Sequence, residues 1–296
     1  MIKRMVCLLA GVFALASCAS EPQEPEASDT PPPSPILYEI ADSDGAARGW
    51  LFGTMHALPD GVEWRTQTLG DVIDSADTLV VEIGDLADRR AISTTFTRLA
   101  TSPRQTDIRS RVSAGDLPVL DDLMKKGNFS SRDFANVETW AAALMLAQVT
   151  STGSTRNGVD GALINEFPAD RVRELEGPFV QLSIFDRLAP QDQRDLLAGV
   201  IDEYRILQED PERLRRAWLK GEEQALIQAT QSGILADPEL KQALLVERNR
   251  AWIDDIDVLI RDGRRPLVAV GAAHLVGEEG LAVLLEAQGY SLERLQ

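Results

Sequence analysis

The sequence predicts an α/β protein, in which a central mixed sheet is flanked by helices and carries a large, mostly helical middle region. Three observations predict this class. Leu267–Val270 is a short apolar run typical of a buried strand, and Gly271 separates it from the apolar periodicity of a helix that begins near Gly280. Two strand patterns at the start of the domain indicate a hairpin. Residues 86–231 have mainly helical patterns.

The first residues form a targeting segment rather than part of the fold. Met1–Arg4 is basic and Met5–Ala14 is apolar, but the apolar run is far shorter than the roughly 20 residues of a membrane-spanning helix. The following Leu15-Ala16-Ser17-Cys18 resembles a bacterial lipobox. This resemblance implies removal of residues 1–17 as a lipoprotein signal peptide and attachment of diacylglycerol to the Cys18 thiol. The alternative is an ordinary signal peptide that contains a cysteine.

The lipobox also predicts where the mature protein lies. Lipidated Cys18 would anchor it to a membrane of the bacterial cell envelope. Ala19 stands where an aspartate marks inner-membrane retention, so the periplasmic face of the outer membrane is favoured. Cys7 is the other of the two cysteines and leaves with the signal peptide. Disulfides, thiolate metal sites and a cysteine nucleophile are therefore excluded.

Residues 18–35 are predicted to form a disordered tether that leads to the folded domain, residues 36–296. The tether is rich in proline, glutamate and serine and has almost no apolar residues, so it cannot build a core. The net charge of the whole chain is −17. Because there is no basic patch to neutralise phosphates, nucleic acid is excluded as a partner.

Strands and short helices follow in order from local patterns. Ile36–Ile40 and Arg48–Phe52 form the predicted hairpin. Gln67–Ala76 is a short helix that packs back on the sheet. Thr78–Ile83 is a buried strand, and Val172–Glu174 is a further strand candidate.

Capping residues mark the longer helices. Leu117–Lys126 ends at a glycine, a common C-terminal stop, and Glu138–Gln148 is apolar on nearly all sides, as in a core helix. Three prolines mark further helix starts: Pro190, Pro211 and Pro238. Asp210 is expected to cap the second of these. The third opens a long amphipathic helix that runs to Gly263.

The only two histidines of the chain share one sequence setting. His56 and His274 each end a Gly-x-x-His motif that follows an apolar strand. Because ligands of α/β sheets bind at the carboxyl edge, we expect both imidazoles in one site. The alternative is that both are polar loop residues.

Glu82 is the third candidate for this site. It lies near the end of an apolar strand, where a buried carboxylate costs several kcal/mol unless it is paired, liganded or protonated. Two histidines and a carboxylate suit a divalent metal with open positions, so His56, Glu82 and His274 are predicted metal ligands. The alternative is that Glu82 lies at the solvated end of the strand.

The chain resembles the TraB/PrgY/GumN family, also called TraB/GumN and related to the Tiki proteins. The resemblance runs from about Tyr38 to the C-terminus and rests on several short motifs in the same order. They are Leu51–His56, Val80–Ile83, Gly158–Asp160, Leu175-Glu176 with Gln181, Glu247–Asn249, and Val270–Gly277 with Gly280-Leu281. One position departs from the family, since Val276 stands where proline is common.

The resemblance implies an EreA/ChaN-like α/β fold and a metal-dependent peptidase activity. It implies that His56, Glu82 and His274 are metal-site or catalytic groups. The predicted cofactor is a divalent metal ion: Mn²⁺, Co²⁺ or Zn²⁺. Arg248 and Asn249 would be their polar partners, and Arg248 suits a substrate carboxylate or a developing oxyanion.

Three expectations for the flanking charges remain open at this point. The alternative to a site role is a surface charge on a helix for Arg248, and a charge at the end of a strand for Glu176. Asp160 is expected to cap or brace a helix rather than to act directly.

Three functions are compatible with these residues. The first is a lipid-anchored, metal-dependent hydrolase of the cell envelope that acts on a peptide or a small molecule. The second is a non-catalytic lipoprotein that sequesters a peptide or another ligand in the same pocket. The third is a metal-free hydrolase that resembles erythromycin esterase and uses histidine and glutamate as an acid–base pair.

Overall fold

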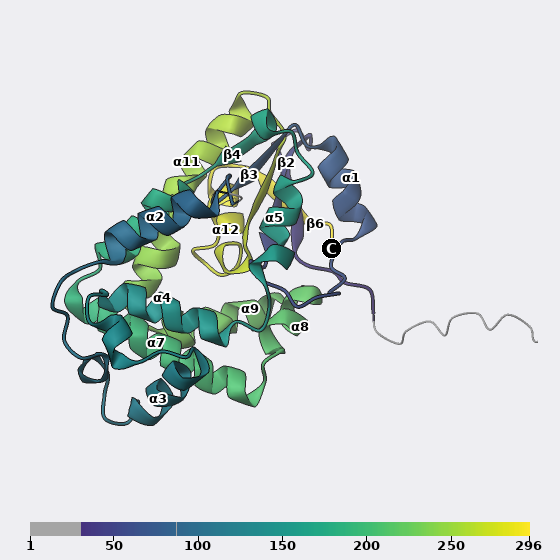
Figure 1. Ribbon diagram of the computed structural model, residues 1–296. Helices are drawn as coiled ribbons and strands as arrows, with labels where there is room; N and C mark the ends of the chain where they lie inside the picture. Colours follow the sequence, from purple (N-terminus) through teal and green to yellow (C-terminus); the bar gives the residue numbers. More distant parts are fainter. Residues whose placement is uncertain (1–30, 87) are drawn as a thin grey trace, which may run out of the picture. The chain divides into compact units, whose positions relative to one another are not determined.

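The computed structural model of the protein describes residues 31–86 and 88–296 (Figure 1). The predicted signal peptide, the lipidation site at Cys18 and most of the predicted tether lie outside these residues. Within them, no helix has the length and apolar character needed to cross a membrane.

A six-stranded mixed sheet organises the domain, in the order β4-β3-β5-β2-β1-β6. Strands β4, β3, β5 and β2 are parallel, whereas β1 is antiparallel to both of its neighbours, β2 and β6. The strands are β1 Leu37–Ala41, β2 Ala47–Thr54, β3 Thr78–Val81, β4 Val172–Glu174, β5 Pro266–Gly271 and β6 Ser291–Arg294. The predicted α/β class and its mixed sheet are confirmed.

The sequence-based predictions for the strands and the tether differ from the structure at three places. The predicted hairpin is confirmed, with Leu37 opposite Phe52. Strand β3 ends at Val81, so Glu82 lies just beyond the strand. Strand β6 was missed because Ser291–Arg294 is mostly exposed and has no strong apolar alternation. Residues at the end of the predicted tether belong to the domain, since the Ser34 N–H donates to the Leu219 carbonyl at 2.6 Å.

Helices flank this sheet and fill the middle of the chain. They are α1 Gln67–Ser75, α2 Arg89–Ala100, α3 Leu117–Lys126, α4 Thr139–Thr150, α5 Val159–Ile164, α6 Gly177–Asp186, α7 Pro190–Glu209, α8 Arg213–Leu219, α9 Glu223–Ala229, α10 Pro238–Lys241, α11 Glu247–Arg261 and α12 Leu281–Ala287. Figure 1 shows α3, α4 and α7 grouped together beside the sheet. The mostly helical middle region is therefore confirmed.

Two helix predictions are wrong in detail. Helix α8 begins at Arg213 and not at Pro211, because the Asp210 carboxylate accepts the Glu212 N–H of a turn and pairs with Arg216. The predicted long helix does start at Pro238, capped by Asp237. A π-helical turn, Gln242–Val246, then divides it into α10 and α11. That turn immediately precedes two predicted site residues.

Two apolar cores hold the domain together. One lies around the sheet and includes Phe52, Leu79 and Trp252, whereas the other lies among the middle helices around Trp140. Burial of apolar surface is the main stabilising contribution in each. The sheet core fixes the strand ends from which the candidate site is built.

Candidate active site

The four parallel strands all end at one edge of the sheet, and each end carries a polar candidate. Thr54 of β2 pairs with Gly271 of β5, so the two Gly-x-x-His loops start side by side. His56 follows β2 and His274 follows β5, while Glu82 follows β3. Carboxyl edges of parallel strands commonly form binding sites, as expected from the sequence.

His56 is paired with a carboxylate from outside the sheet. Its Nδ1 lies 2.9 Å from Asp160 Oδ2, and the Thr54 hydroxyl donates to Asp160 Oδ1 at 2.8 Å. Asp160 lies in the first turn of α5 but makes no capping hydrogen bond. Asp160 does not form the expected helix cap, and its carboxylate contacts His56 and Thr54 instead.

The backbone fixes this pairing through a close approach of α5 to the loop after β2. The Val159 N–H donates to the Met55 carbonyl at 3.0 Å. A Cβ at position 158 would lie 2.2 Å from the His56 carbonyl oxygen, so Gly158 is required there. The Gly-Val-Asp motif is thus explained by packing and by the Asp160 contact together.

Glu82 is buried, with 5% of its surface exposed, and both of its oxygens accept hydrogen bonds. Oε1 accepts the Gly271 N–H at 2.9 Å. Oε2 accepts Arg248 Nη2 at 2.7 Å and Gln181 Nε2 at 3.1 Å. Burial alone would raise the pKa of Glu82, but the charges of His56, of His274 once it is protonated in acid, and of Arg248 lower it to about 2. Glu82 is an ionised site residue and not a solvated strand-end charge.

Arg248 of α11 is a buried cation whose five N–H groups are all engaged. Nε and Nη2 donate to the two oxygens of Glu176 at 2.9 and 3.1 Å, and Nη2 also donates to Glu82. Nη1 donates to the Leu244 carbonyl at 3.1 Å and lies 3.2 Å from His274 Nε2. The alternative of a surface charge is wrong, and in this arrangement no N–H remains for a substrate carboxylate or an oxyanion.

Glu176 is part of this network and not a free strand-end charge. Only 6% of its side chain is exposed, and Oε1 also accepts the Trp252 indole N–H at 3.0 Å. The Arg248 guanidinium lies over the same Trp252 ring, 4.6 Å from its centroid. Glu176 and Trp252 therefore fix the guanidinium in one orientation.

Asn249 fixes the tautomer of the buried His274. The Asn249 amide group donates to the backbone carbonyls of His274 and Glu279, at 3.2 and 2.8 Å, which leaves its Oδ1 facing His274 Nδ1 at 2.6 Å. His274 must therefore carry its proton on Nδ1, and its Nε2 lone pair accepts from Arg248. Asn249 therefore lies against His274, and its role in a reaction stays a prediction.

The two histidines have opposite protonation states at neutral pH. Burial lowers the pKa of His274 to about 3, with Arg248 and His56 acting in the same direction. Burial would also lower the pKa of His56, but the charges of Asp160 and Glu82 raise it to about 9. The His56 side chain is 58% exposed, so solvent screens these interactions partly. His56 can exchange a proton with solvent, whereas His274 is a fixed neutral group.

The three predicted metal ligands meet at this edge, yet their arrangement does not fit a shared divalent ion. His56 Nε2 lies 3.6 Å from Glu82 Oε1, and 58% of the His56 side chain is exposed. The lone pair of His274 Nε2, in contrast, already accepts from Arg248, and so does Glu82 Oε2. Among the described residues, no group of three histidine, cysteine, aspartate or glutamate side chains is arranged to hold a metal.

Gly271 has no side chain and so keeps the space between His56 and Glu82 open. A Cβ there would lie 3.2 Å from His56 Nε2 and 3.3 Å from Glu82 Oε1. We expect Gly271→Ala to fold, because φ is −49°, but to lower turnover by up to about 100-fold by misplacing the reacting atoms. Gly70→Ala, with no atom within 4 Å, is the matched control and should leave turnover unchanged. Normal turnover in folded Gly271→Ala would contradict the placement of the reaction beside this glycine.

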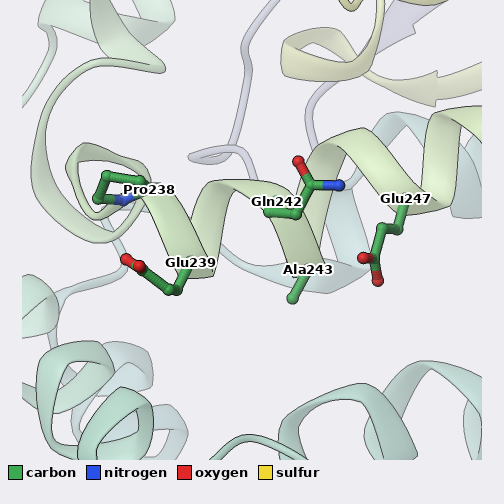
Figure 2. A pocket seen from close by; sticks show the side chains of 5 residues that line it. All are labelled: Pro238, Glu239, Gln242, Ala243 and Glu247. Atoms are coloured by element: carbon green, nitrogen blue, oxygen red, sulfur yellow. The ribbon is translucent and has the colours of Figure 1, made fainter.

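A surface cavity of about 300 Å³ lies next to α11 but is lined by none of the site residues. Its lining runs along α10, the π-helical turn and the first residue of α11: Pro238, Glu239, Gln242, Ala243 and Glu247. Figure 2 shows Ala243 and Glu247 pointing to the same side of this helix. The cavity therefore lies along the helix that carries Arg248 and is not the candidate site.

Five candidate site residues follow from the sequence, and in the structure three more side chains contact them. The five form one chain of contacts, in the order His56, Glu82, Arg248, His274 and Asn249. The additions are Asp160, Glu176 and Gln181. Each belongs to a motif quoted for the family resemblance, but their separation from the histidines in sequence conceals the contacts.

Comparison with known proteins supports this picture at the level of the family. The TraB/PrgY/gumN family matches residues 36–294, which contain the whole sheet and every residue of the site. No curated protein and no solved structure shows a match to the chain.

Proposed function

Since the chain belongs to the TraB/PrgY/gumN family, and since its paired motifs meet in one acid–base site, we propose that it is a hydrolase of peptide or ester bonds. The pair of His56 and Asp160 carries this proposal. The Nδ1 atom of His56 is held by the buried Asp160 carboxylate, while 58% of the His56 side chain is exposed to solvent. A carboxylate-oriented imidazole with one free nitrogen is the general base of many hydrolases.

The proposed reaction uses His56 as a proton carrier. Neutral His56 takes a proton from water at Nε2 as the water oxygen bonds to the scissile carbonyl carbon. Asp160 stabilises the imidazolium through its hydrogen bond to Nδ1, and the anionic Glu82 Oε1, 3.6 Å from Nε2, adds to this stabilisation. The imidazolium then returns the proton to the leaving group as the bond to the carbonyl carbon breaks.

The pH dependence of the rate follows from the raised pKa of His56. Only the neutral imidazole accepts a proton, so kcat/KM should rise with pH until the pKa of about 9 is reached. In Asp160→Asn the carboxylate that raises this pKa is gone, so the rise should shift to lower pH while the maximum rate falls. A rate that instead falls as the pH rises through about 9 would show that His56 acts as the acid and not as the base.

Turnover distinguishes this function from ligand sequestration. The purified protein is incubated with a peptide library and with simple esters, and cleavage products are identified by mass spectrometry. Release of products by the parent but not by His56→Gln supports the hydrolase. Retention of an intact peptide without cleavage supports the non-catalytic alternative and contradicts the proposal.

We also propose that the hydrolase acts in the bacterial cell envelope, anchored through Cys18. Leu15-Ala16-Ser17-Cys18 motivates this location. We expect Cys18→Ala to shift the protein from the membrane fraction to the soluble fraction, because the lipid is then absent. The measurement is fractionation with an antibody against the domain. If the variant still partitions wholly with membranes, the anchor is not at Cys18.

A further inference from the structure

Arg248 occupies the position that a metal ion would need at this sheet edge. A divalent ion held by Glu82 and His274 would require a carboxylate oxygen and the lone pair of His274 Nε2. The guanidinium already lies 2.7 Å from Glu82 Oε2 and 3.2 Å from His274 Nε2. Because arginine is not deprotonated in proteins, this positive charge is permanent.

The fold holds the guanidinium in place from the opposite side. Glu176 accepts from Nε and Nη2, and the Leu244 carbonyl accepts from Nη1. Leu244 lies in the π-helical turn, where the Glu247 N–H donates to the Gln242 carbonyl five residues earlier. π-Helical turns change helix register and recur at functional sites. The turn places Arg248 and its neighbour Asn249 so that both reach His274.

The charges around Arg248 leave little need for another cation. Glu82 and Glu176 are both buried and each forms an ion pair with Arg248, while the exposed His56 adds a further positive charge near Glu82 when protonated. A divalent ion would have to lie beside a fixed guanidinium, and the two positive charges would repel each other. Each of these buried carboxylates already has a cation within ion-pair distance, which weakens its attraction for a further ion.

We propose that the guanidinium of Arg248 takes the place of a divalent cation in this site, which therefore works without a bound metal. For its role in turnover this inference rests on the proposed hydrolase function. Metal binding is measured without substrate. Failure of the metal-free proposal can therefore be distinguished from failure of the hydrolase proposal.

The test compares the parent with Arg248→Ala/Glu176→Gln. This variant removes the cation and one of its two carboxylates together, and leaves Glu82, His56 and His274 free to act as ligands. The probes are Zn²⁺ and Mn²⁺, with binding measured by calorimetry and by the shift in Tm. We expect no stoichiometric binding to the parent at micromolar ion, and unchanged turnover of any cleaved substrate after chelation.

The double variant should gain stoichiometric binding of Zn²⁺ or Mn²⁺ and a higher Tm in its presence, since the ion binds only the folded form. Adding His274→Gln to it should remove that binding. Stoichiometric binding by the parent that is lost in Glu82→Gln would overturn the inference. So would a folded double variant that binds no ion. If the double variant does not fold, the metal content and chelator response of the parent still decide the question.

Discussion

Replacing His56 with glutamine should lower kcat by about 10²- to 10⁴-fold, because the only solvent-facing proton carrier of the site is lost. Asp160→Asn should have a similar effect, since an amide in place of the carboxylate neither holds the same tautomer nor stabilises the imidazolium. The two residues act as one unit, so the double variant should be no slower than the worse single variant. The measurement is steady-state kinetics on a substrate cleaved by the parent.

Stability shows whether His56→Gln acts on the reaction or on the fold. The pKa of His56 is raised in the folded state, so its ionic contribution to stability is full below the unfolded pKa of about 6.5. It is lost as the pH rises through about 9. The unfolding free energies of the parent and of His56→Gln should therefore converge as the pH approaches about 9. Asp74→Asn, an exposed carboxylate of α1, is the control. Turnover by folded His56→Gln within about tenfold of the parent would exclude His56 as the base.

Replacing Arg248 with methionine should lower the free energy of unfolding by about 3–5 kcal/mol. The change leaves Glu82 and Glu176, each with 6% of its side chain exposed, without their shared cation. Adding Glu176→Gln should recover part of the loss, because one of the two uncompensated charges disappears. Mild acid should also reduce the difference in unfolding free energy between Arg248→Met and the parent. The reason is that buried carboxylates without a cation take up protons at a higher pH than paired ones do.

Arg261→Met on the same helix is the matched control. Arg261 forms an i,i+4 ion pair with Asp257, but 66% of its side chain is exposed, so its loss should cost no more than about 0.5 kcal/mol. Urea denaturation of the four proteins measures these differences. Equal losses for the two arginine variants would mean that the buried network contributes no more than a surface pair.

Most of the fold was predictable because local patterns determine it. Helix α3, Leu117–Lys126, and strand β4, Val172–Glu174, have the predicted bounds. The π-helical turn was not predictable, because Gln242–Val246 has the same apolar periodicity as a continuous helix. Strand β6 depends on pairing with β1 at the edge of the sheet, which its own residues do not indicate.

The site was predictable where residues follow strands, and not where partners come from helices. His56 and His274 were singled out because each ends a Gly-x-x-His motif that follows an apolar strand. The contact of Asp160 with His56 was not predictable, because it spans 104 positions in the sequence. Sequence patterns also give no donor geometry, so they did not show that all N–H groups of Arg248 are occupied.

The two histidines of this edge differ, because one carries protons while the other stays neutral. The chain has only two histidines, so an NMR titration of protein labelled with ¹⁵N in histidine follows both without ambiguity. One should titrate well above the ordinary pKa of about 6.5 and shift downward in Asp160→Asn. The other should remain neutral, with its proton on Nδ1, until the pH approaches about 3 or the protein unfolds. Two histidines that both titrate near about 6.5 would contradict the account.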